Sequence, residues 1–274
     1  MSVDLHPEVV EKYETLEKII LELEEVVVAF SAGVDSTLLA KVCYDLLGNR
    51  AVAVTADSPT LPRRDLLETV ELAKEIGIRH EIIKTDELNN PDYAKNDPYR
   101  CYFCKNELCD QLDLIKASTN AKWVLFGENL DDLSDYRPGS QAAMEHGVRA
   151  PLKEAGFTKL EIRALARYLE LPTWNKPASA CLASRIPYGE SVSIEKLSQI
   201  ERAESILWEL GYRGVRVRHH GEIARIEVQP EQMQGIIGDA DRISKSFKEI
   251  GFRYITLDLS GYRRGSLNEG LIQF

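Results

Sequence analysis

The sequence is poor in the features that mark secreted and membrane proteins. Its 274 residues include only five cysteines, an odd number and too few for a disulfide framework. No stretch approaches the roughly 20 consecutive apolar residues that a transmembrane helix needs. The first residues are acidic and amphipathic, unlike a secretory signal or a mitochondrial presequence. We therefore expect reduced thiols, a cytoplasmic location and no membrane partner.

Positive charge is also scarce. Lys and Arg number 34 against 44 Asp and Glu, which gives a net charge of −10. Proteins that bind long nucleic acids draw their affinity from Lys and Arg that neutralise phosphates. The composition therefore argues against a bulk nucleic-acid partner, although it leaves room for a small basic pocket. Hydrophobic residues make up 44% of the chain, which is ordinary for a globular protein with an ample core.

Two successive patterns predict two domains. Up to about residue 188, short apolar runs alternate with helical periodicity, which is typical of a parallel sheet covered on both faces by helices. From residue 193 the order is helix, two strands, helix and strand, which predicts a small antiparallel sheet with helices on one face. We expect an α/β domain over 1–188 and a smaller α+β domain over 189–274 that binds substrate phosphate or forms oligomers, with the boundary near 188–192. The expected strands are 25–30, 51–56, 80–85, 122–127, 214–220, 223–228 and 253–259; the expected helices are 8–24, 36–47, 62–76, 159–170, 193–210 and 230–250.

A loop of small residues follows the first expected strand. Gly33 allows a close backbone approach, and Ser31, Ser36 and Thr37 offer hydroxyl groups. A helix begins at once, and its N-terminus attracts anions. The Walker pattern with its lysine and the G-x-G-x-x-G pattern are both absent. At the carboxyl edge of a parallel sheet such a loop indicates a phosphate site, with an ordinary serine-capped turn as the alternative.

The segment Ser31-Ala32-Gly33-Val34-Asp35-Ser36 resembles the loop of the PP-loop ATP pyrophosphatases, usually written S-G-G-x-D-S. The resemblance implies that ATP is cleaved to AMP and pyrophosphate while a substrate oxygen is adenylylated. Ala32 departs from the usual glycine. Mg²⁺ bridging the phosphates would bind at Asp35, or at Asp131 and Asp132. The expected ATP and pyrophosphate residues are Ser31, Ala32, Gly33, Val34, Asp35, Ser36, Thr37, Ala56, Ser58, Gly127 and Asp131, with ordinary turn chemistry as the alternative at 56–58 and at Gly127.

Three further segments, 127–139, 178–185 and 258–268, resemble the LarE sulfur transferases of that superfamily. The resemblance covers nearly the whole chain, and we expect neither a glutaminase region nor an RNA-binding extension ahead of the loop. LarE enzymes act in making the nickel-pincer cofactor of lactate racemase. The resemblance implies adenylylation of a carboxylate of pyridinium-3,5-biscarboxylic acid mononucleotide and its conversion to a thiocarboxylate. It also implies a homo-oligomer, a hexamer by resemblance.

Cys101, Cys104 and Cys181 are the candidate sulfur-handling thiols. In one group of LarE enzymes a single cysteine, matched here by Cys181, gives up its own sulfur and becomes dehydroalanine. In another group three cysteines hold a [4Fe-4S] cluster and leave one iron free to carry sulfide. Three thiolates at 101, 104 and 181 agree with an open iron. We expect the cluster, with zinc, no metal, or sacrificial donation from Cys181 as alternatives.

The other two cysteines are expected to be structural. Cys43 belongs to the apolar pattern of its helix and is expected in the core. Cys109 lies in a helix expected to begin near Lys105, and we interpret it as a bystander. The C-x-x-C pair before a helix also permits a thioredoxin-type redox site, which the ATP loop makes a weaker hypothesis.

Basic residues of the second domain are candidates for binding the substrate phosphate. Arg216 and Arg218 alternate along an expected strand, with His220 continuing the same face. Guanidinium groups suit phosphate well, and a solvated strand face is the alternative. Glu204 and Glu227 would pair with these arginines or bind a metal.

Arg185 is the expected catalytic arginine, since it lies four residues after Cys181. Arg137 and Arg263 are further candidates, and His219 is expected to face a charged pocket with His220.

The whole sequence predicts a cytoplasmic ATP-dependent sulfurtransferase that uses Cys181, Asp35 and Arg185 in catalysis. ATP, Mg²⁺ and the [4Fe-4S] cluster are the expected cofactors, and a small-molecule nucleotide and sulfide the expected partners. The alternatives are a tRNA thiolase, an ammonia-using amidotransferase and a non-enzymatic nucleotide-binding module. Acidic charge argues against the first, and the cysteine trio argues against the second. The third would release no pyrophosphate.

Overall fold

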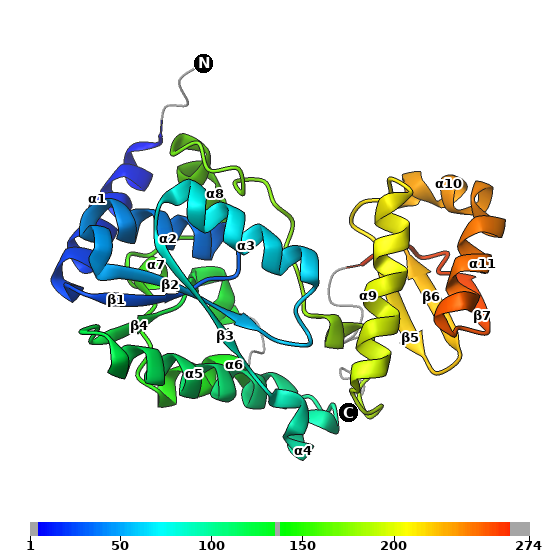
Figure 1. Cartoon of the computed structure of the whole chain (residues 1–274). Helices are drawn as coiled ribbons and strands as arrows, with labels where there is room; N and C mark the ends of the chain where they lie inside the picture. The colour runs from blue at the N-terminus through cyan, green and yellow to red at the C-terminus, as the bar shows by residue number, and fades with distance from the viewer. Residues whose placement is uncertain (1–4, 135–137, 264–274) are drawn as a thin grey trace. The chain divides into compact units, whose positions relative to one another are not determined.

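The computed structural model describes residues 5–134 and 138–263 (Figure 1). The chain forms two compact units. The first unit contains residues 1–87 and 101–179, and the second contains residues 88–100 and 180–274. In this division the chain passes from the first unit to the second at Ala180. The domain boundary near 188–192 stays a prediction. Segment 88–100 joins the second unit because Asn96 donates side-chain hydrogen bonds to the carbonyls of Pro187 and Glu190, at 2.8 and 2.9 Å.

The first unit is built on a four-stranded parallel sheet in the order β3-β2-β1-β4, so the predicted α/β fold class is confirmed. Its central strand is the apolar run that the sequence predicts. Because successive side chains in a strand point to opposite faces, Val26 and Val28 enter one core and Val27 the other. The strands are β1 Val26–Ala29, β2 Ala51–Asp57, β3 Arg79–Lys84 and β4 Trp123–Leu125.

Helices cover both faces of this sheet (Figure 1). One face packs against α1, α2, α3 and α8, and the other against α5 and α6. The helices of this unit are α1 Pro7–Leu23, α2 Val34–Leu47, α3 Arg63–Ile76, α5 Arg100–Ser118, α6 Pro138–Glu145, α7 Pro151–Glu154 and α8 Lys159–Tyr168. The first residue of α5, Arg100, belongs to segment 88–100 of the second unit.

The helix expected to begin near Lys105 starts earlier, at Arg100. The side chain of Asp97 accepts a hydrogen bond from the backbone N–H of Tyr99 at 2.7 Å, and such a local turn starts a helix. Cys101 and Cys104 therefore lie within α5 rather than before it. Residues three apart share one side of a helix, so the two thiols are neighbours.

The second unit contains a three-stranded sheet in the order β5-β6-β7, with β5 Arg216–His220, β6 Ile223–Glu227 and β7 Tyr254–Leu257. The prediction of an antiparallel sheet is right for β5 and β6 and wrong for β7, which runs parallel to β6. A parallel neighbour needs a long crossover connection, and two helices supply it. They are α10 Met233–Gly238 and α11 Ala240–Ile250, in place of one helical stretch, and α9 Ile194–Glu209 precedes the sheet.

A short helix, α4 Pro91–Ala94, lies in segment 88–100. Across residues 5–134 and 138–263, no helix combines the length and the apolar character needed to cross a bilayer.

Candidate active site

The loop after β1 is organised around the hydroxyl group of Ser36. This hydroxyl donates to the carbonyl of Gly33 and accepts from the backbone N–H of Ser31, each at 3.2 Å. The hydroxyl of Ser31 also lies 3.2 Å from it. Helix α2 begins immediately afterwards, with Gly33 as its N-cap. The loop thus leads directly into the N-terminus of a 14-residue helix, whose first N–H groups have no partner within the helix. This is the arrangement that an anion site requires.

Ala32 adopts a backbone conformation that usually belongs to glycine. Its φ angle is 54° and its side chain is fully buried. The left-handed region costs an L-residue about 1–2 kcal/mol, because its Cβ approaches the following carbonyl oxygen. The departure from the glycine of the S-G-G-x-D-S pattern therefore leaves a strained backbone position in the loop.

Gly127 packs directly against the start of α2. A Cβ atom at this position would lie 2.9 Å from the backbone nitrogen of Ser36 and 3.0 Å from the carbonyl carbon of Asp35. Both are backbone atoms that cannot rotate away. Gly127, expected to contact adenosine, therefore has a packing role, and its contact with the nucleotide stays a prediction.

Asp35 is held by two groups from other parts of the first unit. The Lys159 ammonium pairs with its carboxylate, and the Asn129 side-chain amide donates to it at 3.4 Å. The Asp131 carboxylate accepts from the backbone N–H of Lys159 at 2.9 Å, and that of Asp132 accepts from Asn129 N–H at 3.1 Å. The structure thus brings Asp35, Asp131 and Asp132 into one hydrogen-bonded network, while their role in Mg²⁺ binding stays a prediction.

Two lysines reach the loop, and the sequence analysis missed both. Lys159 contacts Asp35 from 124 residues away, and the ammonium of Lys176 donates to the carbonyl of Ala32 from 144 residues away, at 2.9 Å. Lys176 also pairs with Glu68 of α3 at 2.7 Å. The loop lacks the lysine of a Walker motif, and its cations come from distant segments. The one available cue for Lys176 was its place five residues before Cys181.

The residues at the carboxyl end of β2 form hydrogen bonds and an ion pair with neighbouring protein groups. The hydroxyl of Ser58 donates to buried Glu87 and lies 2.7 Å from the hydroxyl of Thr60. The carboxylate of Asp57 pairs with Arg63 at the start of α3. These contacts are the turn chemistry kept as the alternative for this segment. An adenosine contact at Ala56 and Ser58 stays a prediction.

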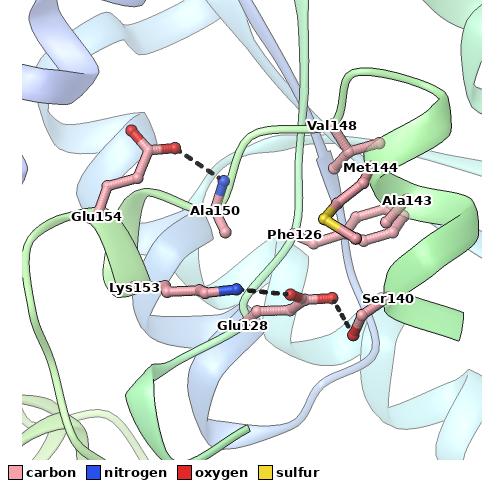
Figure 2. Close-up of a pocket in the computed structure, with 9 residues that line it drawn as sticks. All are labelled: Phe126, Glu128, Ser140, Ala143, Met144, Val148, Ala150, Lys153 and Glu154. Atoms are coloured by element: carbon pink, nitrogen blue, oxygen red, sulfur yellow. Dashed lines mark hydrogen bonds and ion pairs between the residues drawn. The ribbon is translucent and has the colours of Figure 1, made fainter. Parts of the chain in front are cut away.

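A pocket of about 350 Å³ lies beyond the end of β4 (Figure 2). The Glu128 carboxylate accepts a hydrogen bond from Ser140 at 3.1 Å and lies 4.0 Å from the ammonium of Lys153. Glu154 and apolar side chains, including Phe126 and Met144, form the rest of its wall. The pocket adjoins Gly127 in sequence. Sequence reasoning did not find it, because its lining residues come from the segment after β4, from α6, from α7 and from the loop between these two helices.

Burial divides the five cysteines into two sets. Cys43 and Cys109 are at most 1% exposed, which confirms Cys43 as a core residue. Cys109 is buried as well, and its interpretation as a bystander rather than a fourth ligand stays a prediction. Burial raises the pKa of the Cys109 thiol to about 11 and also raises the pKa of Cys43, so both stay protonated. Cys101 is exposed and Cys104 is half-buried on the first turns of α5. These two thiols can reach a ligand.

Cys181 is exposed and belongs to the second unit, directly before the short 3-10 helix Leu182–Arg185. The guanidinium of Arg185 donates to the carbonyl of Cys181 at 2.9 Å. Arg185 is 1% exposed and forms two hydrogen bonds with Glu204, at 2.8 and 2.9 Å. Arg185 therefore fixes the backbone that carries Cys181, and its direct contact with substrate stays a prediction. Within the described segments, no three His, Cys, Asp or Glu side chains form a group able to hold a metal ion.

Arg216 and Arg218 are 9% and 7% exposed, so the alternative of a solvated strand face is wrong. Arg218 pairs with Glu227 at 2.8 Å and donates to the carbonyl of Ser184 at 2.8 Å.

Arg216 has a different environment. Its guanidinium donates to the carbonyl of Val215 at 2.8 Å and lies over the ring of Tyr262. Burial, and then the charge of Arg185, lower the pKa of Arg216. Among the residues that the structure describes, Arg216 has no ion pair with a carboxylate, while its role in binding the substrate phosphate stays a prediction.

The remaining candidate residues are His219, His220, Arg263 and Arg137. His219 contacts Gln199 at 3.0 Å and the ring of Phe252, and burial lowers the pKa values of His219 and His220. Arg263 is exposed, and Arg137 lies outside the described residues.

Comparisons with known proteins cover both the loop and most of the chain. The NAD synthase family model matches residues 9–101, which include the loop. An uncharacterized protein of Synechocystis is 48% identical over 95% of this chain and 98% of its own length. Pyridinium-3,5-bisthiocarboxylic acid mononucleotide synthase of Lactiplantibacillus plantarum is 38% identical over 95% of both chains. An uncharacterized protein of Methanocaldococcus jannaschii is 29% identical over 88% of this chain and 91% of its own.

Proposed function

Because this chain belongs to the LarE family of ATP-dependent sulfur transferases within the PP-loop superfamily, we propose that it sulfurates a pyridinium nucleotide. The substrate would be pyridinium-3,5-biscarboxylic acid mononucleotide, whose carboxylate becomes a thiocarboxylate for nickel-pincer cofactor synthesis. The observation that carries the proposal is the loop at Ser31–Thr37, together with the match over 95% of both chains to a synthase of the bisthiocarboxylic product.

The first unit would activate the carboxylate. A carboxylate oxygen attacks the α-phosphorus of ATP, and pyrophosphate leaves as the acyl-adenylate forms. The hydroxyls of Ser31 and Ser36 and the N–H groups at the start of α2 would bind the departing pyrophosphate. Asp35 already accepts a cation, the ammonium of Lys159, which supports it as a ligand for Mg²⁺. Magnesium would neutralise phosphate charge there.

The second unit would hold the substrate's own phosphate. Arg216 supports this part of the proposal, because its buried guanidinium lacks a carboxylate partner within the described chain. Arg218 is fixed beside it by Glu227, and Glu204 is shared between Arg185 and the backbone N–H of Val217. Carboxylates that orient arginines in this way leave the remaining N–H donors aimed at an anion.

The thiols of Cys101, Cys104 and Cys181 would hold a [4Fe-4S] cluster. The donor set fits, since all three are thiols with some exposure and two of them share one side of α5. When bound, the cluster would supply an open iron that carries exogenous sulfide, and the sulfide sulfur would replace the activated oxygen of the substrate. AMP leaves with that oxygen. Arg185 would hold the Cys181 backbone in place while Cys109, buried and protonated, takes no part.

One experiment tests the sulfur source and the substrate together. The protein is purified without oxygen, reconstituted with iron and sulfide, and supplied with ATP and the pyridinium substrate. We expect bound iron in the wild type and in Cys109→Ala, and its loss in Cys101→Ala and Cys181→Ala, with repeated formation of AMP and thiocarboxylate. Equal iron in all four proteins would contradict the cluster. A single turnover in which Cys181 loses about 34 Da, the mass of H₂S, would identify sacrificial donation instead.

A further inference from the structure

Lys176 contacts the backbone of the strained loop residue and no other residue of the loop. Its ammonium donates to the carbonyl oxygen of Ala32 at 2.9 Å and pairs with Glu68 at 2.7 Å. Its side chain is 18% exposed. A mostly buried ammonium group that is bound to both a carboxylate and a carbonyl oxygen is held in one place.

The carbonyl that Lys176 holds determines where the next N–H group points. In a planar trans peptide the C=O and N–H bonds point in opposite directions. By fixing the carbonyl of Ala32, Lys176 also fixes the N–H group of Gly33 on the other side of that peptide. Gly33 is the N-cap of α2, so its N–H group belongs to the expected anion site.

The segment that carries Lys176 is itself anchored to the first unit. The guanidinium of Arg163 donates to the carbonyls of Trp174 and Lys176 at 2.8 and 2.7 Å. The hydroxyl of Ser179 donates to Asp65 at 2.7 Å. These bonds deliver the ammonium to the loop without a large loss of side-chain freedom on binding.

We propose that Lys176 is a positioning residue: by holding the carbonyl of Ala32 it turns the N–H group of Gly33 toward the β- and γ-phosphates of ATP. This role rests on the proposed ATP-dependent function and deepens it. AMP carries neither of those phosphates, so its binding should not depend on Lys176.

The test measures binding of pyrophosphate, of a non-hydrolysable ATP analogue and of AMP by calorimetry, with no pyridinium substrate present. In Lys176→Met we expect the affinities for pyrophosphate and the analogue to fall about tenfold, because the N–H group of Gly33 is no longer held toward the phosphates. The affinity for AMP should change less than about twofold. Glu68→Gln keeps the ammonium on the carbonyl of Ala32, so it should lower pyrophosphate affinity less than Lys176→Met does.

Several outcomes would overturn the inference. Unchanged pyrophosphate binding in Lys176→Met would do so, as would equal losses for pyrophosphate and AMP. A loss in Glu68→Gln as large as in Lys176→Met, or no pyrophosphate binding by the wild type, would also contradict it. If Lys176→Met does not fold, Lys176→Gln replaces it and the same comparison decides. Failure of the proposed substrate is seen separately, as Lys176-dependent pyrophosphate binding in a protein that does not convert the pyridinium nucleotide.

Discussion

Charge is held in different ways at two places in the molecule. One is the loop edge of the first unit, which is the loop 31–37 with Lys159. The other is the arginine cluster of the second unit, which is Arg185, Arg216 and Arg218 with Glu204 and Glu227. At the loop edge, backbone groups and the half-exposed side chains of Lys159 and Asp35 meet. In the second unit, Arg185 and Glu204 are 1% and 5% exposed and satisfy each other. The first arrangement leaves these side chains partly open to solvent. The second commits most of its charge to the fold, and among the described residues Arg216 has no ion pair with a carboxylate.

This difference implies different consequences of substitution. Removing one partner of a buried ion pair leaves an uncompensated charge in a low dielectric, and stability falls steeply. Changing the loop edge should act mainly through local backbone geometry. Three substitutions test the contrast, from the largest expected effect to the smallest.

Glu204→Ala should cost the second unit about 3–5 kcal/mol of unfolding free energy, because it leaves the guanidinium of Arg185 buried without its carboxylate. It also removes the acceptor of the Val217 N–H. Urea unfolding followed by circular dichroism measures the loss. Glu222→Ala is the matched control: Glu222 and Arg253 in the same unit are each 66% exposed, and that pair is worth at most about 1 kcal/mol. Similar losses in the two variants would contradict the contrast.

Gly127→Ala should destabilise the first unit by about 1–3 kcal/mol, the usual cost of forcing extra atoms into a packed site. The added Cβ would meet the backbone of Ser36 and Asp35 at 2.9–3.0 Å. Gly33→Ala is the control, since its Cβ would meet only the hydroxyl of Ser31, at 3.4 Å. We expect thermal unfolding to separate the two variants. Equal stability of Gly127→Ala and Gly33→Ala would contradict this prediction, because it would show that the backbone after β4 can shift at little cost in free energy.

The loop edge was predictable from the sequence because its signals are local. The apolar run 25–30, the small residues 31–37 and the following helix are contiguous, and parallel-sheet geometry places them at one edge. The buried pairs were not predictable in the same way. Arg185 and Glu204 are 19 residues apart, and Lys176 and Ala32 are 144 residues apart. No periodicity links such residues, since only the tertiary fold brings them together.

Two predictions failed for related reasons. The antiparallel direction expected for β7 depended on how α10 and α11 return the chain, which hydrophobic spacing does not encode. The expected start of α5 at Lys105 overlooked the turn made by Asp97. That turn was visible in the sequence, because aspartate often begins a helix through its side chain.

Ala32→Gly should stabilise the first unit by up to about 1 kcal/mol, the smallest of the three effects. A left-handed φ of 54° costs an alanine about 1–2 kcal/mol, and the greater freedom of glycine in the unfolded chain returns about 0.5–1 kcal/mol of that. Ala40→Gly is the matched control, because Ala40 is equally buried but lies in the helical interior of α2, where glycine costs about 1 kcal/mol. The same chemical change should therefore shift the melting temperature upward at position 32 and downward at position 40. Two downward shifts of similar size would contradict this prediction. They would mean that packing of the buried methyl group of Ala32 stabilises the loop at least as much as the left-handed backbone conformation destabilises it.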